Sequence, residues 1–139
     1  MRRRSIFTRD IEQDVLPPVA ELRVTAVPYS PLGRRMLTGL AFATSLTDTD
    51  ARQHFPRFTA ENLAANMLLV AKINIALTPG VSAAQIALAW HYVQSRKLKV
   101  KTVPIPGRRK CSRLLENVAA ESVILTAREM EALAPLASV

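Results

Sequence analysis

Two short segments with the composition of β-strands constrain this chain more than any other feature. Arg23–Val27 (RVTAV) and Val100–Ile105 (VKTVPI) are apolar and rich in β-branched residues, as buried strands are. Helical patterns precede, separate and follow them, and this alternation is typical of parallel strands in an α/β fold. Two strands cannot form a sheet that is covered on both faces, so we interpret the chain as part of something larger.

Apolar residues at helical spacing predict the helices around these segments. The first stripe consists of Ile11, Val15, Val19 and Leu22. At Pro17 and Pro18 this helix should break or a new one should start, because a proline inside a helix removes a hydrogen bond. A second stripe, between Thr59 and Pro79, consists of Leu63, Met67, Val70 and Leu77. Residues 36–58 lack a clear period, and we predict a long loop there.

Capping boxes predict two more helix starts, at Ser82 with Gln85 and at Thr126 with Glu129. The first of these helices should bury one face, formed by Ile86, Trp90 and Val93. After Gly107 another helix is expected, and we predict that three of its residues point inward: Leu114, Leu115 and Val118. The order of elements supports a single domain over residues 1–139.

Composition excludes several classes of protein. A single cysteine, Cys111, rules out an internal disulfide framework and fits a reducing compartment, so we expect a cytoplasmic protein. Polar residues interrupt the most apolar segment, residues 62–77, which argues against a membrane span. His91 and His54 lie far apart in the sequence, and no metal site is expected.

The net charge of +8 invites an anionic partner, and much of it falls in Arg2–Arg4, Arg96–Lys101 and Arg108–Arg113. A solvated surface is the ordinary explanation of such runs. Nucleic-acid binding is disfavoured, because aromatic residues make up only 5% of the chain and no helix-turn-helix or zinc motif is present.

The ends of the two predicted strands are the places where a ligand would bind in a parallel α/β fold. The first strand runs into Tyr29–Arg34, and the second runs into Pro106–Lys110, directly before a helix. Gly107 permits close approach of the backbone to a ligand, and the helix N-terminus that follows offers unpaired N–H groups.

Polar side chains on that helix extend the candidate site. Arg109 and Arg113 lie four residues apart, so they can share one face and bind phosphate oxygens. Glu116 and Asn117 follow one turn later, where they can hydrogen-bond a nucleobase. These residue types in this order indicate a site for a phosphorylated nucleotide.

Five motifs, in order, resemble the aldo-keto reductase superfamily: YSPLGRRMLTG, PRFTAENLAANMLLV, SAAQIALAW, VPIPGRRKCSRLLENVAA and LTAREMEAL. The likeness extends upstream to FTRDIEQDVLPPVAEL. It implies an α/β fold, the (β/α)8 TIM barrel, with NADP(H) across the carboxyl ends of the strands. Arg23–Val27 resembles strand seven, Val100–Ile105 resembles strand eight, and the residues before Thr8 resemble the end of strand six. The chain therefore resembles a partial barrel, its last two to three βα units only.

The resemblance also implies what the chain lacks. Members of the family reduce carbonyls by hydride transfer, with a tyrosine proton donor supported by lysine, aspartate and usually histidine, all from the first half of the family's sequence. Tyr29 and Tyr92 are the only tyrosines here, and both match other positions. No catalytic residue is assigned, and we expect the isolated chain to be inactive.

The residues that the resemblance implies for cofactor binding are present. The nicotinamide and pyrophosphate positions are matched by Tyr29, Ser30, Pro31, Leu32, Gly33 and Arg34. The adenosine half is matched by Gly107, Arg109, Arg113, Glu116 and Asn117, with Arg113 at the 2′-phosphate or ribose. Arg57 in the PRF motif is a further candidate. Arg108 and Arg35 depart from the family pattern, which commonly has a small or polar residue at the first position and often glycine at the second.

Two hypotheses follow from these observations. The first is the C-terminal, cofactor-binding part of an NADP-dependent aldo-keto reductase; the alternative is a non-catalytic nucleotide-binding or interaction subunit. The expected partners are NADP(H) and either a separate N-terminal half or another copy of the chain. A partial barrel would otherwise leave unpaired strand edges and exposed apolar faces.

Overall fold

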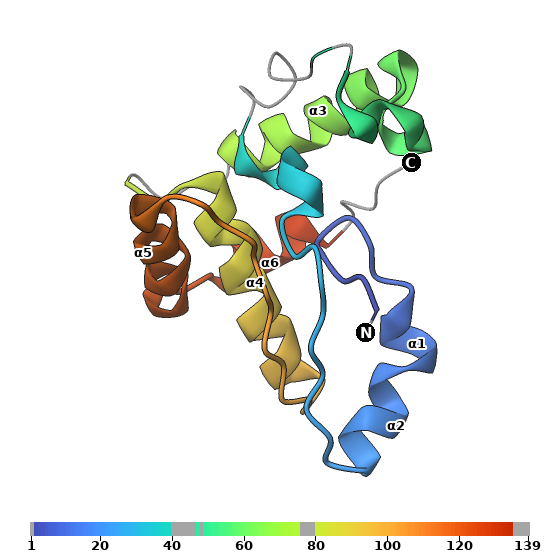
Figure 1. Ribbon diagram of the computed structural model, residues 1–139. Coiled ribbons are helices and arrows are strands. Elements are labelled where there is room, and N and C mark those ends of the chain that lie inside the picture. The colour runs from blue at the N-terminus through green and yellow to red at the C-terminus, as the bar shows by residue number, and fades with distance from the viewer. Residues whose placement is uncertain (1, 40–46, 48, 76–79, 135–139) are drawn as a thin grey trace.

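The computed structural model describes residues 2–39, 47, 49–75 and 80–134, which form helices joined by extended segments (Figure 1). The α-helices are α1 (Ile11–Asp14), α2 (Leu16–Glu21), α3 (Ala60–Ile75), α4 (Ala83–Lys97), α5 (Cys111–Ala119) and α6 (Ala127–Leu133). Short 3₁₀ segments span Gly33–Thr38, Ala51–His54, Pro56–Phe58 and Ala120–Ser122.

The helices begin where local signals predict them. Both predicted capping boxes form, at Ser82 with Gln85 before α4 and at Thr126 with Glu129 before α6. The prolines at positions 17 and 18 lie in the first turn of α2, where a missing N–H costs nothing, so the predicted restart is confirmed. The predicted loop at residues 36–58 contains 3₁₀ turns, and residues 40–46 and 48 of it lie outside the described residues, as does Leu77 of the α3 stripe.

Three extended segments run parallel to one another in the order that a barrel sector requires. Arg3 pairs with Tyr29, and Tyr29 pairs with Ile105, so the segment around Tyr29 lies in the middle. A further bridge joins Ala26 to Thr102 in the same register. These pairings are isolated bridges, however, and the predicted strands at Arg23–Val27 and Val100–Ile105 are not formed as strands in the part of the chain that the structure describes.

Proline explains why the two bridges do not join into one ladder. The N–H of Ala26 donates to the Lys101 carbonyl at 2.8 Å, and the N–H of Val103 donates to the Ala26 carbonyl at 2.9 Å. The next donor along a parallel ladder would be residue 28, which is a proline and has no N–H. Pairing resumes only at Ile105, whose N–H lies 3.4 Å from the Pro28 carbonyl.

The core is built around α4. Trp90, Ile86 and Leu88 of this helix are almost fully buried, as predicted for the first two. They belong to one apolar cluster with residues from α3, α6 and the 3₁₀ segments, including Met36, Leu37, Phe58, Val70, Ile73 and Leu133. A smaller cluster at the ends of α2 and α4 contains Ile11, Leu16 and Val100. Helix α4 therefore holds the other elements in place.

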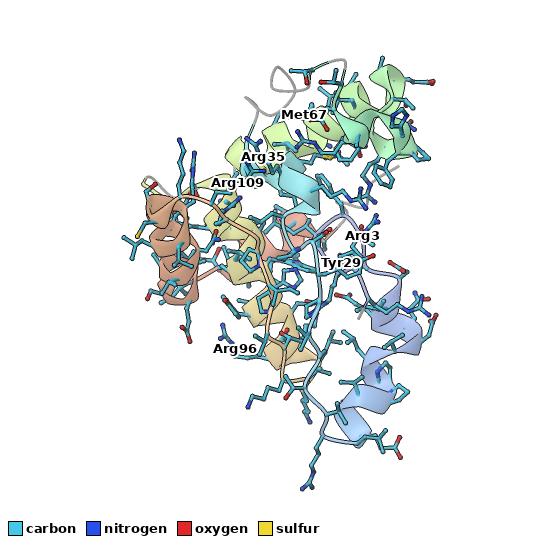
Figure 2. The ribbon with its side chains drawn as sticks, viewed as in Figure 1. Arg3, Tyr29, Arg35, Met67, Arg96 and Arg109 are labelled. Atoms are coloured by element: carbon cyan, nitrogen blue, oxygen red, sulfur yellow. The ribbon has the colours of Figure 1, made fainter. Side chains whose placement is uncertain are left out.

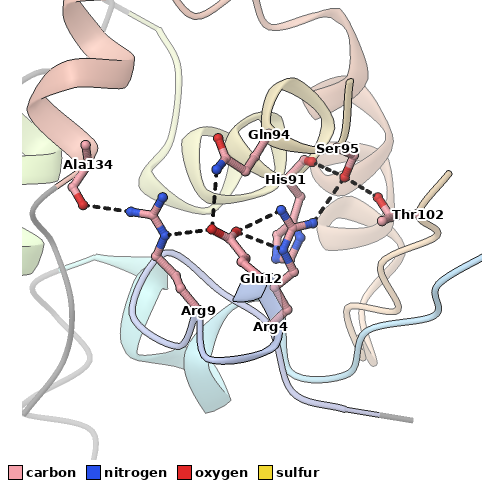
Figure 3. A network of polar contacts seen from close by, with 8 residues as sticks. All are labelled: Arg4, Arg9, Glu12, His91, Gln94, Ser95, Thr102 and Ala134. Carbon is pink, nitrogen blue, oxygen red and sulfur yellow. Dashed lines mark hydrogen bonds and ion pairs between the residues drawn. The ribbon is translucent and has the colours of Figure 1, made fainter. Parts of the chain in front are cut away.

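A polar network fixes the N-terminal segment against α4 (Figure 3). Glu12 accepts hydrogen bonds from Arg4, Arg9 and Gln94, the shortest being 2.9 Å from Arg4. The fully buried Arg4 also donates to Ser95 at 3.1 Å. The guanidinium groups of Arg4 and Arg9 lie 5.3 and 5.2 Å from the Trp90 ring.

The prediction that Leu114, Leu115 and Val118 point inward is wrong, because all three are more than half exposed. On a helix with 3.6 residues per turn these three share one face, opposite Glu116 and Asn117. Glu116 accepts a hydrogen bond from Ser82 at the start of α4, and Asn117 is buried. That anchoring turns the polar face of α5 toward α4 and its apolar face outward.

The extended segment at Arg23–Val27 is likewise not buried as predicted. Val24 and Val27 are exposed, and so are Val103 and Ile105 on the neighbouring segment. The bridge register puts Val27, Val103 and Ile105 on one face, whereas Thr102 on the other face contacts Ser95 of α4. Val27, Val103 and Ile105 are between 37% and 48% exposed, so the described residues cover the first of these faces only in part.

Candidate functional site

The carboxyl ends of the two extended segments meet in a pocket of about 310 Å³. It is lined by Tyr29, Ser30, Pro31, Leu32, Arg34, Arg35, Ile105, Pro106, Gly107 and Arg108. Six of these residues are among the eleven candidates that the sequence analysis names. The parallel register brings the two turns together, because it places the end of one segment beside the end of the other.

The first turn is built from unusual backbone. Ser30, Gly33, Arg34 and Arg35 all have positive φ, between 52° and 78°. The turn closes with a hydrogen bond from the Gly33 N–H to the Ser30 carbonyl at 3.0 Å. Left-handed backbone at non-glycine residues is strained and tends to occur at functional positions. Gly33 of this turn is buried, and a Cβ at its position would lie 3.6 Å from the Leu37 side chain and 3.7 Å from that of Met36.

The second turn leads directly into α5. Gly107 follows Pro106, and the space around its Cα is open, so a ligand can approach the backbone there. Helix α5 begins at Cys111, and its N-cap residue, Lys110, makes no side-chain capping hydrogen bond. The first N–H groups of α5 are thus not capped by their own N-cap side chain, and they carry the positive end of the helix dipole.

The charges around the pocket are predominantly positive. Burial lowers the pKa of Arg108; Glu116 opposes this effect, and the neighbouring Arg113 and Arg35 add to it. The Arg108 Nε is buried and has no hydrogen-bond partner among the described residues. Figure 2 shows Arg35 and Arg109 at the same end of the molecule. The arrangement gathers cations around a space large enough for an anionic ligand.

Glu116 is already engaged within the chain. Its carboxylate accepts hydrogen bonds from Arg113 at 2.8 Å and from the Ser82 hydroxyl at 2.6 Å. Burial raises the pKa of Glu116, but these two hydrogen bonds and the charges of Arg113 and Arg108 together outweigh it and hold the pKa below its usual value. The hydrogen bond to Glu116 raises the pKa of the exposed Arg113. Glu116 therefore orients Arg113 and ties the middle of α5 to the start of α4.

Asn117 lies on the same side of α5 and is buried, with both amide atoms lacking a partner among the described residues. A buried amide without partners is costly unless a ligand or water satisfies it. Arg109, in contrast, is exposed and does not line the pocket. Of the predicted residues of the adenosine half, only Gly107 lies in the pocket wall; Arg109 precedes α5, and Arg113, Glu116 and Asn117 lie on it.

The structure adds two arginines that the sequence analysis did not select as candidates. Arg35 and Arg108 both line the pocket. Both residues differ from the pattern of the family that the chain resembles. This difference in the sequence could have identified them as candidate site residues. Their positions, one in each turn, place positive charge on both sides of the same space.

A second pocket, of about 210 Å³, adjoins the first through a shared residue, Arg34. Arg3, Phe55 and Arg57 also contribute to its wall. The Arg34 guanidinium stacks 3.7 Å from the centre of the Phe55 ring. Burial lowers the pKa of Arg57, and the charges of Arg3 and Arg34 lower it further. The PRF motif thus places a third arginine near the first turn.

The described residues offer no alternative metal centre or membrane segment. They contain no group of three or more potential metal ligands. His91 is fully buried in α4, and burial lowers its pKa to about 3, so it is neutral at physiological pH. None of the described helices is long and apolar enough to cross a membrane.

Comparisons with known proteins point to one family. A family model described as the aldo/keto reductase family matches residues 3–137. A curated relative from Glycine max, named Probable aldo-keto reductase 1, is 36% identical over 127 residues, which cover 91% of this chain and 36% of the relative. The chain therefore spans little more than a third of the length of that relative.

Two solved structures are similar in fold. A thermostable aldo-keto reductase in complex with the inhibitor epalrestat has a TM-score of 0.63 and 27% identity, over 97% of this chain and 38% of its own. The glycerol dehydrogenase of Gluconobacter oxydans has a TM-score of 0.78 and 22% identity, over 97% of this chain and 41% of its own. The second likeness, at this low identity, is evidence for the fold alone.

Proposed function

This chain belongs to the aldo/keto reductase family, and on that premise we propose that it is the NADP(H)-binding part of an oxidoreductase. The observation that carries the proposal is the pocket at the ends of the two extended segments. Six residues implied by the family resemblance line it, and two additional arginines, Arg35 and Arg108, lie among them.

The proposal includes the fold of the whole domain. The segments around Arg3, Tyr29 and Ile105 would be the ends of strands six, seven and eight of a (β/α)8 barrel. Their parallel order supports this assignment, since neighbouring barrel strands pair in sequence order. The exposed face with Val27, Val103 and Ile105 would then be the barrel interior, which the remaining strands complete.

The residues present fit an NADP(H) molecule. Tyr29 would lie beside the nicotinamide, and the strained turn at Ser30–Arg34 would surround the pyrophosphate. Arg108 and Arg113 would hold the 2′-phosphate, because an arginine fork matches the geometry of phosphate oxygens. Asn117 would satisfy its buried amide on the adenine. When bound, the cofactor supplies or accepts a hydride; this chain's residues bind and orient it.

Carbonyl reduction would require groups that this chain does not supply. The family resemblance places the proton-donating tyrosine and its supporting residues in the first half of the family's sequence. We therefore expect cofactor binding without turnover from the chain alone. A non-catalytic nucleotide-binding subunit is the second candidate, because the candidate residues that line the pocket are binding residues and no catalytic residue is assigned to this chain.

Calorimetric titration of the folded chain with NADPH and with NADH tests the proposal. We expect saturable NADPH binding and weaker NADH binding, with Arg108→Ala or Arg113→Ala weakening NADPH binding roughly tenfold or more, the effect of losing one charge-assisted hydrogen bond. Lys72→Ala, at an exposed position on α3, is the matched control and should change nothing. Equal binding of both nucleotides, or binding of neither by a folded chain, would contradict the proposal.

A further inference from the structure

A second concentration of positive charge lies at the opposite end of α4 from the nucleotide pocket. We call it the basal surface and define it by Leu22, Arg23, Val24, Arg96, Lys97, Lys99 and Lys101. Figure 2 shows Arg96 at this end, and Arg35 and Arg109 at the other. Helix α4 has 15 residues, so roughly 20 Å separates its ends, and a nucleotide in the first pocket leaves this charge unexplained.

The five cations of the basal surface are all exposed, and none forms an ion pair among the described residues. Arg96, Lys99 and Lys101 line a shallow pocket of about 250 Å³ together with the half-buried Tyr92. Carboxylates are few here: Glu21 ends α2, and Glu121 lies close enough to raise the pKa of Tyr92, although burial is the larger cause. The positive charge is therefore largely unneutralised.

At this end of the molecule, two cationic residues adopt a backbone conformation that glycine favours. Both α2 and α4 end in the same motif, in which the residue after the C-cap adopts positive φ. These residues are Arg23, with φ of 52°, and Lys99, with φ of 54°. The motif is closed by hydrogen bonds from Val24 N–H to the Val19 carbonyl and from Val100 N–H to the Ser95 carbonyl, at 3.1 and 3.0 Å.

The two strained cations also occupy equivalent positions. Each is the residue after the C-cap of its helix, and the extended segments that follow them pair at Ala26 and Thr102. Glycine is the residue that fits this backbone without strain. Residues in strained backbone are often functional. A functional role for the positive charge would explain why long cationic side chains occupy both positions.

We propose that the basal surface is a docking site for an acidic segment of a partner protein, one that carries apolar side chains among its carboxylates. Charge complementarity selects an acidic partner. Leu22 and Val24 flank Arg23 and are 71% and 53% exposed, so the surface also offers apolar contacts. A nucleic acid fits less well, because Tyr92 is the single aromatic residue in the pocket wall and stacking is a main source of single-strand affinity.

The test measures fluorescence anisotropy of a labelled peptide of alternating aspartate and leucine, with an asparagine-for-aspartate peptide as control. Lys97→Ser/Lys101→Ser should weaken binding of the acidic peptide roughly tenfold, whereas Lys72→Ser/Arg128→Ser, which removes the same charge elsewhere, should leave it within twofold. Lys99→Gly should raise the thermal stability of the chain and still weaken its binding of the acidic peptide. This result would distinguish the loss of a contact from damage to the fold.

The proposal is independent of the nucleotide site, so saturating NADPH should not displace the peptide. Three outcomes would overturn it: no binding of the acidic peptide, equal losses in the two double variants, or tighter binding of a single-stranded oligonucleotide or phosphatidylserine vesicles through the same lysines. The last outcome would keep the anion-binding surface but assign it to a different class of partner.

Discussion

Helices α4 and α5 are neighbours with opposite relations to the core. Ten residues of α4 are buried, among them Trp90, whereas in α5 Asn117 alone is buried and Leu115 is 64% exposed. Both helices carry apolar residues at helical spacing. The difference shows that an apolar stripe predicts a helix but does not decide which face is covered, because the cover comes from elsewhere in the chain or from a partner.

The contrast also separates stability from binding. Helix α4 packs against several other elements of the chain, while α5 presents its polar face to the start of α4 and lies directly after the pocket turn at Gly107. We therefore expect changes in α4 to act on the free energy of unfolding, and changes in α5 to act on ligand binding and self-association. Four measurements test this division.

Trp90→Ala should have the largest effect on stability. Removing a buried tryptophan costs about 3–5 kcal/mol, and Arg4 and Arg9 also lose the ring beside them. Leu115→Ala in α5 should cost less than about 1 kcal/mol, because its side chain is mostly exposed. Urea denaturation of both variants gives the comparison, and similar losses would show that α5 is buried in solution.

Glu12→Gln, in α1, should come next, at about 3 kcal/mol, since it leaves the buried Arg4, which lies over Trp90 of α4, without its charge partner. The matched change in α5 is Glu116→Gln, whose partner Arg113 is 60% exposed, so its cost should be well below 1 kcal/mol. Thermal denaturation measures both. A larger loss for Glu116→Gln would mean that the link from Ser82 to Glu116 is central to folding.

Acid should destabilise the chain through His91 of α4. Burial lowers the pKa of His91 from 6.5 to about 3. Between these two values the imidazole is protonated in the unfolded state and neutral in the folded state, so a lower pH favours unfolding. Stability is complete above pH 6.5 and is lost as the pH falls toward 3. Between pH 7 and pH 5 the loss should be about 2 kcal/mol. His91→Phe should remove this part of the pH dependence, and an unchanged slope would show that other groups cause it.

The smallest effect on unfolding belongs to the outer face of α5. Leu115→Lys should change the free energy of unfolding by less than about 0.5 kcal/mol, yet it should reduce self-association, because it breaks an exposed apolar patch. Sedimentation velocity at several protein concentrations measures this, with Lys72→Leu as the reverse control. If Leu115→Lys unfolds the chain, this face is part of the folded core.

Much of the fold follows from local signals. The capping boxes at Ser82 and Thr126 and the restart at Pro17 form as predicted, because caps and prolines act within a few residues. The turns at Tyr29 and Gly107 meet in one pocket, as the parallel arrangement of their segments implies. The predicted binding roles of these residues stay predictions until a nucleotide is titrated.

The errors all concern contacts between distant parts of the chain. Pro28 is visible in the sequence, but only the register shows that it stands where the ladder needs a donor. The orientation of α5 depends on a hydrogen bond between Glu116 and Ser82, 34 positions apart. Arg35 and Arg108 enter the site because two separate turns converge.

The sequence alone thus determined where several helices begin, which turns resemble a nucleotide site, and to which family the chain is related. These properties depend on neighbouring residues and on motif order. The tertiary structure decided which apolar faces are covered, which cations share a pocket and which polar atoms lack partners. Burial and pairing are properties of residues brought together from afar, and a linear pattern does not contain those distances.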